Sequence, residues 1–121
     1  KTKNSKHKFN YELMRNLNRG KQMKTVWTIS APNNEEKKYG KHPTQKPYQL
    51  LERIILACTD EKDIIFDPFS GSSTTAIAAI KNNRFFVGSE LDKEYINLSI
   101  KRIEDAIESK KNHINLFEVN L

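Results

Sequence analysis

The chain of 121 residues has little cysteine and no grouped histidine. Its one cysteine, Cys58, excludes an internal disulfide framework, and its place on the apolar side of an expected helix favours an inert buried thiol. His7, His42 and His113 have no partner at metal-ligand spacing, so we expect no zinc site. No apolar run approaches 18 residues and no signal peptide is visible, which favours a cytoplasmic protein without a membrane segment.

Signatures of phosphate binding are also missing. Neither G-x-G-x-x-G nor G-x-x-x-x-G-K-[ST] occurs, which disfavours a pyrophosphate cradle. Instead, residues 67–75 read Asp-Pro-Phe-Ser-Gly-Ser-Ser-Thr-Thr, directly after the apolar run of residues 64–66. A buried strand that leads through a turn of small residues into a helix lets a ligand approach the backbone. The start of that helix offers unpaired N–H groups to the ligand.

An acid follows the next expected strand, residues 84–88. Glu90 comes 23 positions after Asp67. In α/β nucleotide-binding folds, an acid about 20 residues after the first strand holds ribose hydroxyls. The spacing therefore indicates an adenosine-type cofactor lying across two strand ends, while spacing alone leaves a plain strand–helix corner open.

Three ordered blocks resemble the S-adenosylmethionine region of beta-class DNA amino-methyltransferases, which methylate exocyclic amines of adenine or cytosine. The blocks are His-Pro-Thr-Gln-Lys-Pro at 42–47, residues 67–75, and Gly-Ser-Glu-Leu-Asp-Lys-Glu-Tyr at 88–95. The resemblance, which covers about residues 21–104, implies an α/β fold class. We expect a partial Rossmann-like S-adenosylmethionine-dependent methyltransferase fold, the cofactor-binding half of a doubly wound sheet. The family usually has Gly where Ser73 stands, and the added Cβ is expected to lower cofactor affinity.

The resemblance also implies the residues of a cofactor site. Glu90 matches the acid that holds the ribose, Asp67 the acid near the methionine amino group, and Phe69 an aromatic packed on the cofactor. The block at 42–47 matches the segment that closes over the methionine end. For Ser72, Thr74 and Asp92, which stand at expected helix starts, a helix-capping role is an alternative explanation. The expected set is His42, Thr44, Lys46, Asp67, Phe69, Gly71, Ser72, Thr74, Glu90 and Asp92.

No catalytic residue is expected in this chain. The family carries its chemistry on an Asp/Asn/Ser-Pro-Pro-aromatic loop, and the sequence contains no Pro-Pro pair. Residues 30–33 and 67–70 come nearest but lack the second proline. In the beta class that loop lies N-terminal to the recognition segment. We therefore interpret the chain as the C-terminal piece of a longer enzyme, and expect this stretch alone to be inactive.

Charge divides the chain near residue 48. Residues 1–48 hold 12 Lys or Arg and 3 Asp or Glu, a net +9, whereas residues 49–121 hold 9 and 12, a net −3. The basic part favours contact with a phosphate backbone, and a solvated surface is the alternative. We expect residues 1–40 to end a target-recognition region and residues 41–121 to form the S-adenosylmethionine-binding subdomain. Candidate phosphate contacts are Lys21, Lys24, Lys37, Lys38 and Lys41.

The resemblance implies a site-specific DNA methyltransferase of a bacterial-type restriction-modification system. Residues 22–27, leading into Lys41 and His42, resemble adenine-modifying members, so adenine N6 is the expected target. A non-catalytic DNA-binding remnant and an unrelated nucleoside-binding α/β domain are the alternatives. The implied partners are double-stranded DNA, a second copy of the chain in a homodimer, and a cognate restriction endonuclease.

Hydrophobic periodicity predicts the secondary structure. One side of the helix after Asp92 carries isoleucines at positions 96, 100, 103 and 107, which we expect to face the core. The expected helices span residues 47–58, 74–81 and 93 onward, and the expected strands span residues 25–30, 64–66, 84–88 and 113–119. Residues 1–24 are expected to form a short basic helix or a loop around Tyr11, Leu13, Met14 and Leu17, ending near Gly20.

Overall fold

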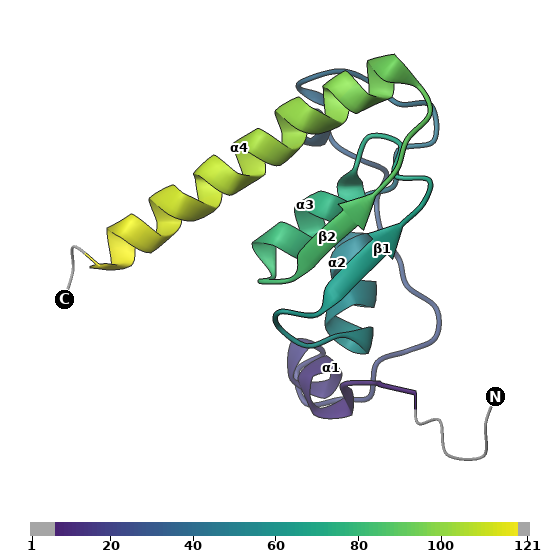
Figure 1. Cartoon of the computed structure of the whole chain (residues 1–121). Helices are drawn as coiled ribbons and strands as arrows, with labels where there is room; N and C mark the ends of the chain where they lie inside the picture. Colours follow the sequence, from purple (N-terminus) through teal and green to yellow (C-terminus); the bar gives the residue numbers. More distant parts are fainter. Residues whose placement is uncertain (1–6, 119–121) are drawn as a thin grey trace.

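The computed structural model describes residues 7–118, with side chains described to Asn112. Figure 1 shows a short α1, a compact centre of α2, α3 and two strands, and a long α4 whose C-terminal half extends beyond the rest. The elements are α1 (Tyr11–Leu17), the 3-10 helix η1 (Glu35–Lys37), α2 (Tyr48–Cys58), β1 (Ile64–Asp67), α3 (Thr74–Lys81), β2 (Phe85–Gly88) and α4 (Lys93–Glu118). Within the described part, no helix is both long and apolar enough to cross a lipid bilayer.

β1 and β2 form a two-stranded parallel sheet. The register pairs Ile64 with Phe85 and Asp67 with Gly88. Parallel strands need a crossover connection, and α3 supplies it, so these elements make one strand–helix–strand unit of an α/β fold. Both strands end at the same edge. The chain after β1 therefore lies beside the chain after β2, and the Ser70 N–H donates to the Ser89 carbonyl at 2.9 Å.

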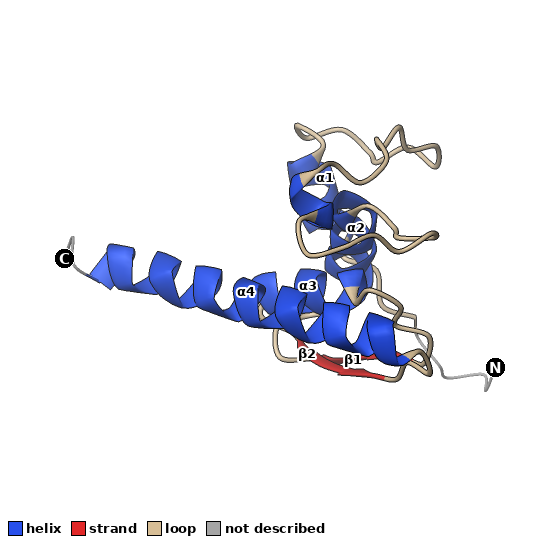
Figure 2. Ribbon diagram, turned by 90° about the horizontal axis from the view of Figure 1, so that it is seen from above, coloured by secondary structure: helices blue, strands red, loops and turns tan. Residues whose placement is uncertain are grey.

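Figure 2 shows α1, α2 and α3 on one side of the two strands. The core between them is built on Ile55 of α2 and the small residues Ala78 and Ala79 of α3, against which Ile65 and Phe86 pack. Alanine on α3 lets α2 and the strands approach closely. The opposite face of the sheet is exposed and apolar, whereas sheets of this class are normally covered on both faces. It carries Ile64, Phe66, Phe85 and Val87.

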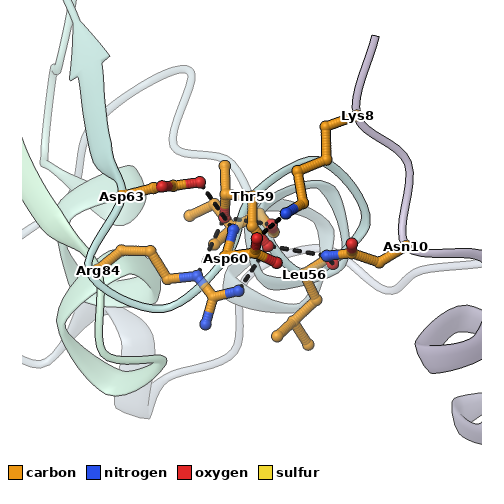
Figure 3. A network of polar contacts seen from close by, with 8 residues as sticks. Lys8, Asn10, Leu56, Thr59, Asp60, Asp63 and Arg84 are labelled. Carbon is orange, nitrogen blue, oxygen red and sulfur yellow. Dashed lines mark hydrogen bonds and ion pairs between the residues drawn. The ribbon is translucent and has the colours of Figure 1, made fainter. Parts of the chain in front are cut away.

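The N-terminal segment is fastened to the end of α2 (Figure 3). The Asn10 side-chain amide donates to the carbonyls of Leu56 and Thr59 at 2.9 and 2.8 Å. The Arg84 guanidinium donates to the Thr59 carbonyl at 2.7 Å and to its hydroxyl at 3.0 Å. These donors satisfy carbonyl groups that any α-helix leaves free at its C-terminus. Met14 of α1 is only 1% exposed, so its side chain is buried where α1 contacts α2.

The predicted helices at α2 and α3 and the two predicted strands of the sheet are confirmed. Of the helix or loop expected in the N-terminal part, the structure shows the helix α1. Two other predicted strands are wrong. Residues 25–30 are irregular, because no other described segment pairs with them. Residues 113–118 continue α4, and no Gly or Pro follows Ile107 to end that helix. Val119, the last residue of that predicted strand, and residues 1–6 of the basic segment lie outside the described residues.

Two expectations about burial are also wrong. Cys58 is exposed at the end of α2, where Ile55 and Ala57 are the buried residues. On α4 the isoleucine face is not the buried one, since Ile96, Ile100 and Ile107 are exposed. The buried side faces α3 and the loop before it. Its residues are Leu98, Ser99, Arg102 and Ala106.

Candidate cofactor-binding site

A cavity of about 220 Å³ opens at the carboxyl end of β1. It collects residues from the block at 42–47, from the loop after β1, and from the first turn of α3. The expected cofactor residues that line it are His42, Thr44, Lys46, Asp67, Phe69, Gly71, Ser72 and Thr74. Segments about 25 residues apart in the sequence therefore meet here, and of the expected set only Glu90 and Asp92 lie outside the lining.

The loop after β1 makes a tight turn. Gly71 and Ser73 both have left-handed backbone conformations, with φ of +53° and +57°. The Ser73 N–H closes the turn on the Ser70 carbonyl at 2.7 Å. This turn brings the start of α3 to the cavity, where the first N–H groups of any helix lack intrahelical acceptors and favour a negative group.

Glu90 joins the two strand ends. One of its carboxylate oxygens accepts the Gly71 N–H at 2.8 Å, and the other accepts the N–H groups of Leu91 and Asp92 at 2.8 and 2.9 Å. The hydrogen bond from Asp92 is the main cause that holds the pKa of Glu90 below its ordinary value, with Gly71 and Leu91 acting in the same direction. A carboxylate offers about four acceptor sites. Three are occupied here, so this fixed, ionised group keeps capacity for about one further donor.

Asp67 organises the loop that it precedes. Its carboxylate accepts the Phe69 N–H at 3.1 Å and the Thr75 hydroxyl at 2.6 Å. Asp67 therefore caps the turn after β1 and also lines the cavity. The Phe69 ring is 88% exposed at the cavity, so it is not a core residue.

His42 lies over the loop. Its ring packs on Tyr95 of α4, with ring centroids 4.1 Å apart, and its Nδ1 accepts the Thr44 N–H at 3.2 Å. On the other side it meets Gly71, where an added Cβ would stand 3.1 Å from the imidazole Nε2. Gly71 is therefore required twice, for its positive φ and for the close approach of His42.

Two expected residues, Asp92 and Thr74, make hydrogen bonds within the protein. Asp92 is the N-cap of α4, where its carboxylate accepts the Glu94 N–H at 2.8 Å. Capping accounts for this residue, and Asp92 does not line the cavity. Thr74 is buried, and its hydroxyl accepts a hydrogen bond from Arg102 of α4 at 3.2 Å, in a residue that also lines the cavity.

Several residues that line or contact the site were not among those predicted from the sequence. Gln45 and Thr75 line the cavity and fall inside two of the recognised blocks, so block membership was a usable signal. Gln45 Oε1 is a buried acceptor with no partner among the described residues, while its amide nitrogen donates to the Glu36 carbonyl at 2.8 Å. Ser99 and Arg102 contact the loop from α4, and no motif marks them.

The expected DNA-contacting lysines fall into two groups. Lys21, Lys24 and Lys41 are exposed, and Lys37 is half-buried. Lys38 is different, because its ammonium pairs with Glu35 at 2.8 Å and with Asp105 of α4 at 3.2 Å. The Lys38 pKa is raised by these carboxylates, Glu35 first. The lysines of the first group have no such described ion pair, so a phosphate would meet less competition there.

Comparison with known proteins establishes the family. The sequence model of the N6 and N4 methyltransferases, described as DNA methylase, matches residues 1–101. The chain belongs to the DNA methylase family. A relative in that family, the Type II methyltransferase M2.DpnII of Streptococcus pneumoniae, is 55% identical over 102 residues, which are 84% of this chain. The DNA adenine methyltransferase YhdJ of Escherichia coli is 44% identical over 67% of this chain.

A solved structure of similar fold confirms the fold class. The crystal structure of the M1.HpyAVI–SAM complex matches 84% of this chain with 36% identity and a TM-score of 0.65. The fold is therefore the partial Rossmann-like α/β methyltransferase fold that the motifs imply. The chain spans 38% of the length of M2.DpnII and 46% of the M1.HpyAVI chain.

Proposed function

We propose that the chain is the S-adenosylmethionine-binding portion of a site-specific DNA methyltransferase, which transfers a methyl group to the exocyclic amine of a DNA base. Adenine N6 is the proposed target, within a restriction-modification system. The observation that carries the proposal is the cavity at the end of β1, which gathers the blocks at 42–47 and 67–75. It is supported by the match to M1.HpyAVI, whose structure is a SAM complex.

The lining fits the chemistry of this cofactor. Lys46 and the start of α3 suit a carboxylate, and the unpartnered Gln45 Oε1 and the Asp67 carboxylate suit an ammonium group. Glu90 keeps acceptor capacity for a ribose hydroxyl at the neighbouring strand end. The exposed ring of Phe69 offers an apolar face to an adenosine group.

The chain's own task is to bind and orient. S-adenosylmethionine supplies an electrophilic methyl group on a sulfonium. Residues around the cavity hold that donor in one position, which lowers the entropic barrier to attack by the amine. The target base must leave the duplex to reach the site, since its amine is inaccessible in the stack. The Pro-Pro loop, which would contact the amine, has no counterpart in these residues.

The organisation and partners are part of the same proposal. Residues 41–121 would form the cofactor subdomain, and residues 1–40 would end the target-recognition region and face double-stranded DNA. The net +9 of residues 1–48 and the exposed Lys21, Lys24 and Lys41 support the DNA contact. The uncovered apolar face of the sheet supports association with further protein, including a second copy in a homodimer. The proposal also includes a cytoplasmic location and a cognate restriction endonuclease as the functional partner.

The test is a pair of measurements on the complete protein that carries this chain. Calorimetric titration should detect S-adenosylmethionine binding and no comparable binding of NAD or ATP. Labelled cofactor should then transfer its methyl group to duplex DNA, and nucleoside analysis should find N6-methyladenine. Absence of cofactor binding would overturn the proposal. Binding without transfer would indicate the non-catalytic remnant, and N4-methylcytosine would correct the target base.

The isolated residues 1–121 provide an internal check on the assigned roles. Without the Pro-Pro loop, this stretch should transfer no label above background in a preparation free of host methylase. Incorporation of label by residues 1–121 would contradict the assignment of the chemistry to that loop.

A further inference from the structure

Two side chains of α4 contact the backbone of the loop after β1. The Ser99 hydroxyl donates to the Gly71 carbonyl at 2.8 Å, and the Arg102 guanidinium donates to the Ser72 carbonyl. Neither carbonyl accepts a backbone hydrogen bond from the residues that the structure describes. Ser99 and Arg102 are three positions apart, so they project from one side of the helix. α4 therefore supplies the partners that the loop's own backbone lacks.

The burial of Arg102 argues that this contact has a specific purpose. Arg102 is 7% exposed and Ser99 is 6% exposed. Burial lowers the pKa of Arg102, and no described carboxylate lies within ion-pair distance of it. A buried guanidinium without a close counter-ion is unfavourable, and an apolar residue of similar size is commonly tolerated at such helix contacts. We attribute the presence of arginine at this position to its hydrogen bond with the loop, which fixes the loop's geometry.

Peptide planarity links these carbonyls to the cavity. In a trans peptide the C=O and the following N–H point in opposite directions. Holding the Gly71 carbonyl toward α4 turns the Ser72 N–H away from α4, and Ser72 lines the cavity. Holding the Ser72 carbonyl toward α4 turns the Ser73 N–H toward the Ser70 carbonyl, which closes the turn at 2.7 Å.

We infer that Ser99 and Arg102 are positioning residues for the cofactor, which hold the loop so that the Ser72 N–H faces the donor's carboxylate. The inference rests on the proposed cofactor site. It goes beyond that site because both residues lie behind the loop, on the helix after β2, and neither lines the cavity. The same contacts stabilise the left-handed conformation of Ser73.

Lys110 provides a matched control. Like Arg102, it is a cation of α4 that donates to a main-chain carbonyl, that of Ile80 at 2.6 Å. Its target lies in the last turn of α3, so it stabilises the same helix pair without touching the loop. A role limited to packing α4 on α3 would make the two cations equivalent.

The experiment uses the complete protein in five forms: parent, Arg102→Met, Arg102→Lys, Ser99→Ala and Lys110→Met. S-adenosylmethionine affinity is measured by calorimetry well below each melting temperature. Arg102→Met should weaken affinity about tenfold or more, and Ser99→Ala about threefold, as expected for removal of a charged and a neutral hydrogen bond. Arg102→Lys should recover most of the affinity, and Lys110→Met should bind within twofold of the parent.

Hydrogen exchange without cofactor gives a readout that general destabilisation would not reproduce. In Arg102→Met and Ser99→Ala, exchange should rise in the segment 69–74 and stay at parent levels in α2 and β2. Equal cofactor affinity in parent and Arg102→Met would overturn the inference, as would equal decreases in affinity for Arg102→Met and Lys110→Met. If Arg102→Met does not fold, Arg102→Lys and Ser99→Ala decide by the same criteria. A parent protein that binds no cofactor would instead overturn the proposed function.

Discussion

The Glu90 carboxylate accepts the Gly71 N–H at 2.8 Å, so the end of β2 is tied directly to the loop after β1. The remaining oxygen accepts the N–H groups of Leu91 and Asp92. An acid expected to bind a ribose thus also aligns the two strand ends.

Replacing Glu90 by Ala should weaken S-adenosylmethionine binding by about tenfold to a hundredfold, the value of hydrogen bonds made by a charged group. Calorimetry on the complete protein measures the change. Glu94→Ala is the control, because it removes the same charge from an exposed position in the first turn of α4. Equal affinity in parent and Glu90→Ala would show that the ribose contact is assigned to the wrong residue.

The stability contributed by Glu90 should depend on pH. Its folded pKa lies below the ordinary value of 4.5, chiefly because the Asp92 N–H stabilises the carboxylate. The contribution is therefore fully present above pH 4.5 and is lost as pH falls through the lower folded pKa. Chemical unfolding of parent and Glu90→Gln at a series of pH values should give two curves that converge below pH 4.5. A stability difference that persists unchanged at lower pH would contradict this.

Gly71→Ala should damage the site more than the fold. A left-handed alanine is unfavourable by about 1–2 kcal/mol wherever it stands. Gly20 also has positive φ, at +79°, but has nothing within 4 Å of an added Cβ, whereas at Gly71 the Cβ meets His42. Both alanine variants should lose similar stability, and only Gly71→Ala should lose cofactor affinity, by about tenfold or more. Parallel affinity losses would remove the special role given to the close approach of His42.

Ser73→Gly tests the position at which the chain departs from the pattern of its family. Ser73 has φ of +57°, and its side chain makes no capping hydrogen bond. Glycine should raise the free energy of unfolding by about 1 kcal/mol and should maintain or improve cofactor affinity. Asn83→Gly, at φ of +62° in the turn before β2, is the control that changes stability alone. Weaker cofactor binding by Ser73→Gly would show that the serine itself contributes.

The lysine prediction concerns DNA affinity. Replacing Lys21, Lys24, Lys37 and Lys41 together by Gln should make the plot of log K against log salt shallower, by roughly 0.9 for each phosphate that no longer meets a lysine. Lys38→Gln should leave the slope unchanged, because Glu35 and Asp105 already neutralise that ammonium. Titrations of the complete protein with duplex DNA over a range of salt concentrations provide the slopes. Overlaid slopes for parent and quadruple variant would assign these lysines to solvated surface.

Local signals determined much of this protein. Pro47 before α2, the Asp92 cap before α4, and the apolar runs of β1 and β2 act over a few residues, so they can be recognised without a partner segment. The three ordered blocks likewise indicated the family, and the blocks at 42–47 and 67–75 contain most of the residues that line the cavity. The predicted strand at residues 25–30 failed for the complementary reason, since alternation describes one strand and a sheet needs its neighbour.

Tertiary structure alone decided which surfaces meet. Periodicity shows that α4 has an apolar side, but α3 and the loop contact a different side, the one bearing Ser99 and Arg102. The closure of His42 over Gly71, the exposure of Cys58 and the ion pair of Lys38 with Asp105 were equally hidden. Each depends on how elements dozens of residues apart pack together. No short-range pattern encodes those distances, because they follow from the simultaneous packing of all the elements.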